Sequence, residues 1–143
     1  MKKLEELDLI FQDYIAPEDA HILNHILEEH NFDETATRRS TLAILLRDGD
    51  HRTVGGIVGT IAWGLLYITT LSVHSQFRGQ GYGAKLLAAA EQEGMARGCH
   101  LAHLHTMSFQ APAFYQKHGY TVFKVLEGEP REYKRYLLEK KLG

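Results

Sequence analysis

Several residue types are scarce in this sequence, and each shortage excludes a class of protein. Cys99 is the only cysteine, so no disulfide can form within the chain and nothing indicates an oxidising compartment. No apolar run reaches the roughly 18 residues that a membrane span needs; the longest apolar-rich stretch, residues 57–73, is interrupted by Gly59 and Gly64. The first six residues turn acidic at once and have no apolar core, so we expect no secretory signal. These absences predict a cytoplasmic protein that does not bind membranes.

The sequence also lacks an excess of either positive or negative charge. The formal net charge is −2 and the sequence pI is about 6.5, with basic residues spread along the chain. DNA-binding domains usually gather Lys and Arg on one face and have a pI above about 9, so we expect no nucleic-acid partner. The 143 residues, 44% hydrophobic and 24% charged, fit one globular domain spanning residues 1–143.

Hydrophobic spacing predicts alternating strands and helices. Residues 7–12 alternate loosely and suggest a first strand, and apolar residues spaced at helical intervals after Pro17 predict an amphipathic helix that ends near His30. The polar residues 31–39 are predicted to be a loop. Further strands are expected at 41–46, 54–63, 65–73, 101–106, 120–126 and 133–138, and further helices at 84–97 and 112–118. This order, β-α-β-β-β-α-β-α-β-β, is typical of a mixed α/β sheet.

A glycine-rich loop, residues 78–83 (RGQGYG), lies between a predicted strand and a predicted helix. Glycines allow positive φ and close approach of a ligand to the main chain, and free N–H groups at a helix start form an anion site suited to a pyrophosphate. A tight turn without a ligand is one alternative. A dinucleotide-binding loop is another, but it needs an acidic residue about 20 positions later, where residues 102–106 offer no carboxylate. A Walker A loop is excluded because Leu86 follows Lys85.

Residues 65–83 resemble the acetyl-CoA-binding motif of the GNAT (GCN5-related N-acetyltransferase) family. That motif is a strand ending in an apolar-x-Val pattern, followed by [RQ]-x-x-G-x-[GA]. Arg78, Gly81 and Gly83 occupy the three defined positions of the loop.

Residues 108–120 resemble the second motif of the same family, N-x-x-A-x-x-[LF]-Y-x-K-x-G-[FY]. The matching residues are Ala111, Phe114, Tyr115, Lys117, Gly119 and Tyr120. Ser108 stands where the family usually has Asn; a serine can still form a hydrogen bond or help to cap the helix. The two motifs occur in the family's order, separated by one helix and one strand.

The resemblance implies the acyl-CoA N-acyltransferase fold, a mixed, splayed central β-sheet flanked by helices, with the cofactor in the opening between the two central strands. It implies acetyl-CoA as co-substrate and no metal. The cofactor-binding residues it implies are Leu71, Ser72, Val73, Arg78, Gly79, Gln80, Gly81, Tyr82, Gly83, Ala84, Ser108 and Tyr115.

The resemblance also implies a direct transfer. The backbone of residues 71–73 would pair with the pantetheine arm, and one of its N–H groups would stabilise charge on the thioester oxygen. Amides of residues 78–84 would hold the pyrophosphate. Tyr115 corresponds to the family's general acid, which protonates the departing thiolate.

The general base stays open. Many relatives carry a carboxylate on the strand before the loop, where this sequence has Thr69 and Thr70, whose hydroxyls could order a water. Other candidates are His105, Glu28, Glu29, Asp33 and Glu34. Trp63, Tyr67 and Phe77 are interpreted as core or rim residues rather than as an acceptor pocket.

The sequence therefore predicts an N-acetyltransferase that moves acetyl from acetyl-CoA to a primary amine of a small molecule. Two alternatives stay open: a protein lysine or N-terminal acetyltransferase, and an acyl-CoA-binding module without turnover. No metal site is expected, because the nine histidines follow no zinc-binding spacing. Homodimers are common in the family, but nothing in the sequence indicates one.

Overall fold

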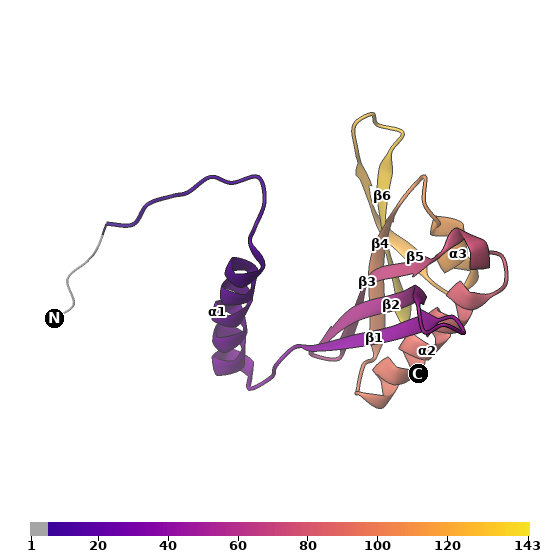
Figure 1. Ribbon diagram of the computed structural model, residues 1–143, viewed down its shortest axis with the longest axis horizontal. Helices are drawn as coiled ribbons and strands as arrows, with labels where there is room; N and C mark the ends of the chain where they lie inside the picture. The colour runs from indigo at the N-terminus through magenta and orange to yellow at the C-terminus, as the bar shows by residue number, and fades with distance from the viewer. Residues whose placement is uncertain (1–5) are drawn as a thin grey trace. The chain divides into compact units, whose positions relative to one another are not determined.

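The computed structural model describes residues 6–143, which divide into two units, one ending at Arg38 and one beginning at Arg39. Figure 1 shows the elements of each unit along the chain. In chain order they are α1 (Pro17–Thr35), β1 (Ser40–Arg47), β2 (Thr53–Ala62), β3 (Leu65–Val73), the 3-10 turn η1 (Ser75–Phe77), α2 (Tyr82–Ala96), β4 (Leu101–Met107), α3 (Pro112–Lys117), β5 (Thr121–Glu127) and β6 (Lys134–Lys141).

The first unit contains one helix, α1, which is longer than the sequence predicts. Pro17 occupies the first turn, where its missing N–H costs nothing. The helix continues past His30 because residues 31–35 contain no Gly or Pro. It ends where Ala36 takes a left-handed conformation, φ 55°, and its N–H donates to the Phe32 carbonyl at 2.7 Å. The predicted polar loop at 31–39 is therefore wrong over its first five residues.

The predicted first strand at residues 7–12 is also wrong, because these residues are irregular and pair with no described strand. A strand exists only where a neighbour accepts its main-chain hydrogen bonds, and alternation alone cannot supply one. The apolar side chains here are exposed, Phe11 by 92%.

The second unit is built on a six-stranded sheet in the order β1-β2-β3-β4-β6-β5. All neighbouring strands are antiparallel except the central pair, β3 and β4, which run parallel. This pair is short: Leu65, Leu66 and Tyr67 are matched to residues 101–103, and the pairing stops there. Both strands nevertheless continue, β3 to Val73 and β4 to Met107.

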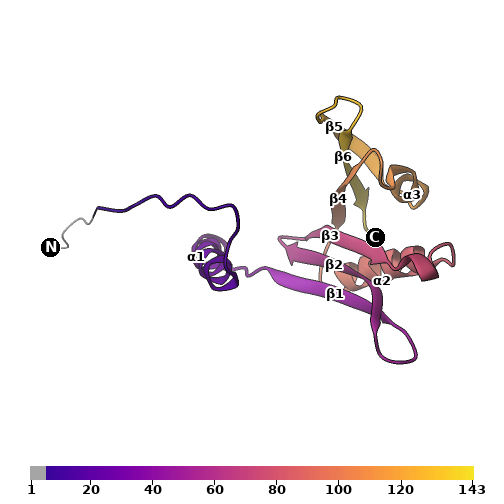
Figure 2. The same cartoon turned by 45° about the horizontal axis from the view of Figure 1, so that its top comes forward.

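The sheet therefore opens beyond Tyr67. In Figure 2, β1–β3 and β4–β6 run in different directions from their meeting point. This confirms the predicted mixed, splayed sheet. It also leaves the β4-facing edge of residues 69–73 without a strand partner among the described residues.

Helix α2 covers one face of the opened sheet. Its buried residues Leu86, Leu87 and Ala90 join a single core with side chains from both halves of the sheet. The approach is close at Gly94, where a Cβ would lie 3.1 Å from the side chain of Leu66 on β3. Small residues on α2 thus set the distance between helix and sheet.

A buried polar network connects α2 to the β5–β6 side of the sheet. Glu91 on α2 is 9% exposed and accepts hydrogen bonds from the Tyr120 hydroxyl at 2.8 Å and the Lys140 ammonium at 2.9 Å. Burial, reinforced by Glu91, raises the pKa of the Tyr120 phenol far above its ordinary value, so the phenol stays a donor. The network satisfies a carboxylate that would otherwise be costly to bury.

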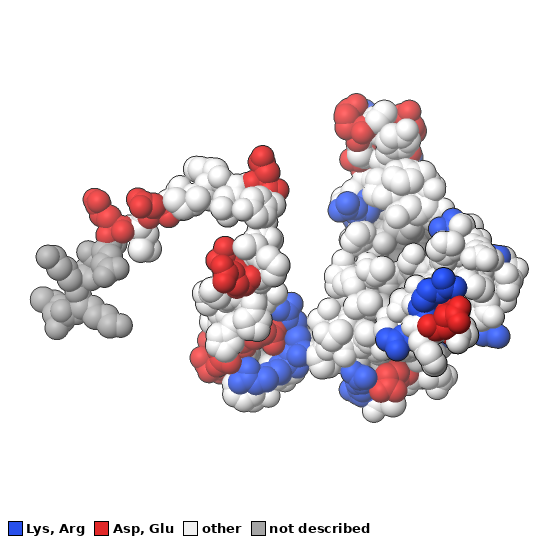
Figure 3. All heavy atoms as spheres, viewed as in Figure 1, with Lys and Arg blue, Asp and Glu red and all other residues white. Residues whose placement is uncertain are grey.

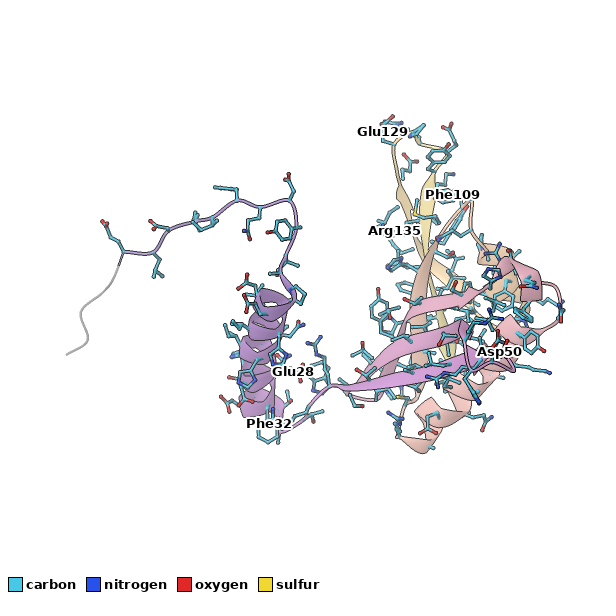
Figure 4. The ribbon with its side chains drawn as sticks, viewed as in Figure 1. Glu28, Phe32, Asp50, Phe109, Glu129 and Arg135 are labelled. Atoms are coloured by element: carbon cyan, nitrogen blue, oxygen red, sulfur yellow. The ribbon has the colours of Figure 1, made fainter. Side chains whose placement is uncertain are left out.

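The β5–β6 hairpin projects beyond the core. Its tip carries Glu127, Glu129 and Glu132, visible as the acidic group in Figure 3. Figure 4 shows Phe109, on the loop after β4, beside this hairpin, where its ring meets Tyr133 edge-on with 5.5 Å between centroids. Between residues 6 and 143, none of the helices has the length and apolar character needed to cross a membrane.

The buried network predicts a stability effect. Tyr120→Phe should lower the free energy of unfolding by about 1.5–3 kcal/mol, the usual range for a hydrogen bond to a charged group, because Glu91 Oε2 loses its donor. Chemical denaturation followed by circular dichroism measures the change. Tyr14→Phe, at a side chain that is exposed, is the matched control. Equal unfolding midpoints for the two variants would contradict the prediction.

Candidate functional site

The predicted glycine loop lies at the end of β3 and is held by short-range hydrogen bonds. The His74 imidazole Nδ1 accepts the Gln76 N–H at 3.1 Å, which starts the turn η1. The Arg78 side chain folds back, and its Nε donates to the Val73 carbonyl at 2.9 Å. Arg78 thus fastens the loop to the strand that precedes it.

Two glycines in this loop require a conformation that other residues rarely adopt. Gly79 has φ 76° and Gly81 has φ 84°, and a Cβ added at either would meet nothing within 4 Å. Gly81 is the residue before the first turn of α2, so the helix begins at Tyr82, two residues earlier than predicted. The loop therefore presents bare main chain at the mouth of a helix.

The start of α2 offers unpaired donors. The Lys85 N–H donates to the Gly81 carbonyl at 3.1 Å, the first bond of the helix, so the amides of residues 82–84 have no partner within it. The helix dipole adds positive potential at the same place. An anionic group is the ligand that this arrangement favours.

Helix α3 faces the start of α2 across a cavity of about 620 Å³. Phe114 on α3 lies against Gly83, where a Cβ would touch its ring at 3.5 Å. The cavity extends from the end of β3 along the glycine loop to α3. Two sequence motifs that lie far apart in the chain thus form one hollow.

Most of the predicted cofactor residues line this cavity. They are Leu71, Ser72, Val73, Arg78, Gly79, Gly81, Tyr82, Gly83, Ala84 and Tyr115. Gln80 does not; its side chain donates to the Gln76 carbonyl at 3.4 Å. Ser108 does not either: its hydroxyl donates to the Glu132 carbonyl at 3.1 Å and accepts the Lys134 N–H at 3.0 Å, where β4 meets β6. The cofactor contacts of all twelve residues stay predictions.

Tyr115 lies where this cavity meets a second one. The second cavity, of about 180 Å³, occupies the opening between β3 and β4, and both Tyr115 and Leu71 line the two cavities. Burial raises the pKa of the Tyr115 phenol. Among residues 6–143 its hydroxyl has no hydrogen-bond partner, although its ring packs edge-on against Tyr120. The phenol is thus a protonated donor without a partner at the junction.

The cavity in the opening, called here the splay cavity, gathers several polar side chains. Its lining includes Thr69, Thr70, His105, Thr106 and Gln110. Thr69 is the extra residue of a β-bulge, because Val58 pairs with Thr70 and Gly59 pairs with Ile68. Its hydroxyl donates to the Val58 carbonyl at 3.1 Å.

The candidate bases separate into two groups. His105 shares the splay cavity with Tyr115 and the two threonines. Glu28, Glu29, Asp33 and Glu34 lie on α1, in the other unit, and their roles stay predictions. Within residues 6–143, no three His, Cys, Asp or Glu side chains gather as metal ligands.

Sequence reasoning did not select every residue of the larger cavity. Phe77 and His118 line it, as do Ala111, Phe114 and Lys117 of the second motif. The last three could have been chosen from their positions in the motif. Phe77 and His118 carry no such signal, because only the folding of η1 and α3 turns them toward the hollow.

Comparison with known proteins identifies the family. The family model described as "Acetyltransferase (GNAT) family" matches residues 4–120 of the chain. The chain belongs to this family. An acetyltransferase of Agrobacterium fabrum is 44% identical over 80 residues, covering 56% of this chain and 58% of that protein. Blasticidin-S acetyltransferase of Streptomyces morookaense is 37% identical over 89 residues, covering 62% of this chain and 65% of that protein.

These GNAT relatives are matched over less than two thirds of their own length. A solved structure covers more: a candidate acetyltransferase from Agrobacterium tumefaciens is 31% identical, covers 95% of this chain and 100% of its own, and superimposes with a TM-score of 0.84. The splayed sheet and its flanking helices are therefore those of the family.

The glycine loop generates a prediction with a matched control. Gly81→Ala should weaken binding of acetyl-CoA by about tenfold or more, because the added methyl group would occupy open space in the cavity where the pyrophosphate is predicted to contact the main chain. Gly98→Ala is the control: Gly98 has φ 88°, no neighbour within 4 Å of an added Cβ, and lies after the other end of α2. Both variants bear similar backbone strain, so calorimetry should show weaker binding for Gly81→Ala only. Equal affinities would contradict the site.

Proposed function

We propose that this GNAT protein is an N-acetyltransferase that moves acetyl from acetyl-CoA to a primary amine of a small molecule. We further propose that residues 1–143 act as one acetyltransferase domain, since the family match spans both units. A cytoplasmic location is consistent with the single cysteine, which is buried and unpaired. The observation that carries the proposal is Tyr115, whose phenol lies where the larger cavity joins the splay cavity.

The residues of the larger cavity fit acetyl-CoA. The open space at Gly79 and Gly81 and the unpaired amides of residues 82–84 suit a pyrophosphate. The unpaired edge of β3 offers main-chain donors and acceptors to an extended amide-containing arm. Bound there, acetyl-CoA supplies a thioester carbon that an amine can attack.

Tyr115 acts as the general acid in this proposal. As the amine nitrogen bonds to the thioester carbon, the carbon–sulfur bond breaks and the sulfur takes the electron pair. The Tyr115 phenol, kept protonated by burial, donates its proton to that thiolate. A main-chain N–H of residues 71–73 stabilises the charge that develops on the carbonyl oxygen.

We propose His105 as the general base. It lines the splay cavity together with Thr69 and Thr70. An imidazole can accept a proton near neutral pH, and the threonine hydroxyls can order a water between it and the amine. His105 therefore removes the proton that the attacking amine must lose.

Two observations support a small-molecule acceptor. The splay cavity, at about 180 Å³, admits a small group rather than a folded surface. One relative is named for acetylating the small molecule blasticidin S. Neither identifies the acceptor of this chain.

The proposal is tested by binding and turnover. We expect calorimetry to show saturable binding of acetyl-CoA, and release of free thiol when small primary amines are added. Equal or faster thiol release with peptides that carry a free N-terminus or lysine would favour a protein acetyltransferase. Binding without thiol release for any amine would show a module without turnover, and absence of binding would contradict the proposal altogether.

Tyr115→Phe separates catalysis from binding. It should lower kcat by about 10²-fold or more, as for loss of a general acid, while affinity for acetyl-CoA stays nearly unchanged because the ring remains. Tyr133→Phe, on the exposed hairpin, is the control. An unchanged kcat in Tyr115→Phe would remove its role as acid.

The raised pKa of Tyr115 sets the sign of a pH effect. The phenol acts only when protonated, and its pKa lies above the ordinary value of about 10. We therefore expect kcat to rise as the base and the amine lose protons, and not to fall again below about pH 10. A wild-type pH–rate profile that declines well below that pH, with the decline absent in Tyr115→Phe, would contradict this assignment.

A further inference from the structure

A third cavity, of about 270 Å³, lies on the face of the sheet opposite α2. Its floor contains Tyr67 of β3 and His103 of β4, the last residues paired before the sheet opens. Their chain neighbours Leu66 and Ala102 are buried in the core under α2, so alternation directs Tyr67 and His103 to the other face. This cavity belongs to neither of the two described above.

Aromatic rings line the cavity, and the two in its floor cover one face of each other, so that only the opposite face of each can accept a further ring. Tyr67 and His103 stack with 4.9 Å between ring centroids and 15° between planes. Trp63 also lines the cavity and is 48% exposed. We call Trp63, Tyr67 and His103 the aromatic shelf.

The backbone of Trp63 supports a role for its ring outside the core. Trp63 has φ 53° and Gly64 has φ 77°, the pattern of a two-residue hairpin turn in which Asn or Gly usually precedes Gly. A bulky residue in this conformation is strained, and such strain gathers at functional sites. The indole ring of Trp63 is therefore half exposed, on a residue whose backbone conformation disfavours a bulky side chain.

The shelf cavity shares a lining residue with the splay cavity, which in turn shares one with the larger cavity where acetyl-CoA is proposed to bind. Thr69 lines both the shelf cavity and the splay cavity. Tyr115 lines both the splay cavity and the larger cavity. A ligand on the shelf can therefore direct a short arm past Thr69 toward the Tyr115 phenol.

The residues that line the shelf cavity and the splay cavity carry little formal charge. They include no Asp or Glu, and Arg39 is their one formally charged side chain. Burial lowers the pKa of His103, which keeps its imidazole neutral near pH 7. Glu139, the residue opposite His103 on β6, opposes this shift without reversing it, so the shelf offers uncharged aromatic rings with one carboxylate beside them.

We propose that the acceptor is a primary amine joined by a short linker to a flat aromatic or heteroaromatic ring, with the ring stacked on the aromatic shelf and the amine in the splay cavity. This substrate class rests on the proposed acetyl transfer. It distinguishes the acceptor from polyamines and from saturated amines of equal size, because stacking requires a flat ring.

Three probes test the substrate class: 2-phenylethylamine, the equally sized 2-cyclohexylethylamine, and spermidine. We expect thiol release from acetyl-CoA with kcat/KM for 2-phenylethylamine about fivefold to tenfold above that for the cyclohexyl compound, in line with the usual strength of aromatic stacking, and spermidine lowest. Tyr67→Leu should abolish the preference and leave the affinity for acetyl-CoA unchanged. Tyr133→Leu, which removes an exposed aromatic ring elsewhere, should keep the preference.

A second readout does not depend on turnover. Trp63 is the only tryptophan, so intrinsic fluorescence reports directly on the shelf. With coenzyme A present, 2-phenylethylamine should change the emission saturably, and 2-cyclohexylethylamine and spermidine should not. This measurement uses the wild-type protein and stands even where Tyr67→Leu fails to fold.

The outcomes separate the two proposals. Acetyl transfer without a preference for the aromatic amine, or with a preference that Tyr67→Leu retains, would overturn the substrate class and leave the acetyltransferase intact. The same fluorescence change with all three amines would likewise contradict the proposal that the aromatic shelf binds the ring of the acceptor. Failure to bind acetyl-CoA would overturn the proposed function, and a selective fluorescence response would then still show an aromatic binding site.

Discussion

The arrangement of the site depends on where β3 and β4 stop pairing. Three residue pairs join them, and then the strands diverge while each continues for several residues. This parting exposes one edge of β3, creates the splay cavity and leaves room for α3 to face the start of α2. If β3 and β4 paired along their whole length, the exposed edge, the splay cavity and the room for α3 would all be lost.

Helix α2 allows the sheet to open without dividing the core. It packs against β1, β2 and β3, while its buried Glu91 bonds to Tyr120 and Lys140 on the β5–β6 side. The same helix supplies at its N-terminus the unpaired amides that line the larger cavity. Helix α2 thus contributes to both stability and the proposed binding. Substitutions at its start should affect mainly binding, and substitutions around Glu91 mainly stability.

The three cavities share lining residues, Thr69 between the shelf and splay cavities and Tyr115 between the splay and larger cavities, and each has distinct chemistry. The glycine loop offers main-chain donors, the junction offers the Tyr115 phenol, and the shelf offers ring faces. The bulge residue Thr69 lines both the splay cavity and the shelf cavity. In the proposed reaction, each cavity would contact a different part of the two substrates.

Local sequence determined much of this protein. The glycines with positive φ and the Pro in the first turn of α3 predicted the loop and the helices, because these are properties of neighbouring residues. The resemblance of the two motifs to the GNAT family implied ten of the residues that line the larger cavity. Only the tertiary structure decided the rest. Whether residues 7–12 form a strand depends on a partner elsewhere in space, and the position of Ser108 depends on β6. Likewise, Tyr67 and His103 become part of a shelf only because pairing of β3 with β4 stacks two rings that are 36 positions apart in the sequence, a contact that no local pattern encodes.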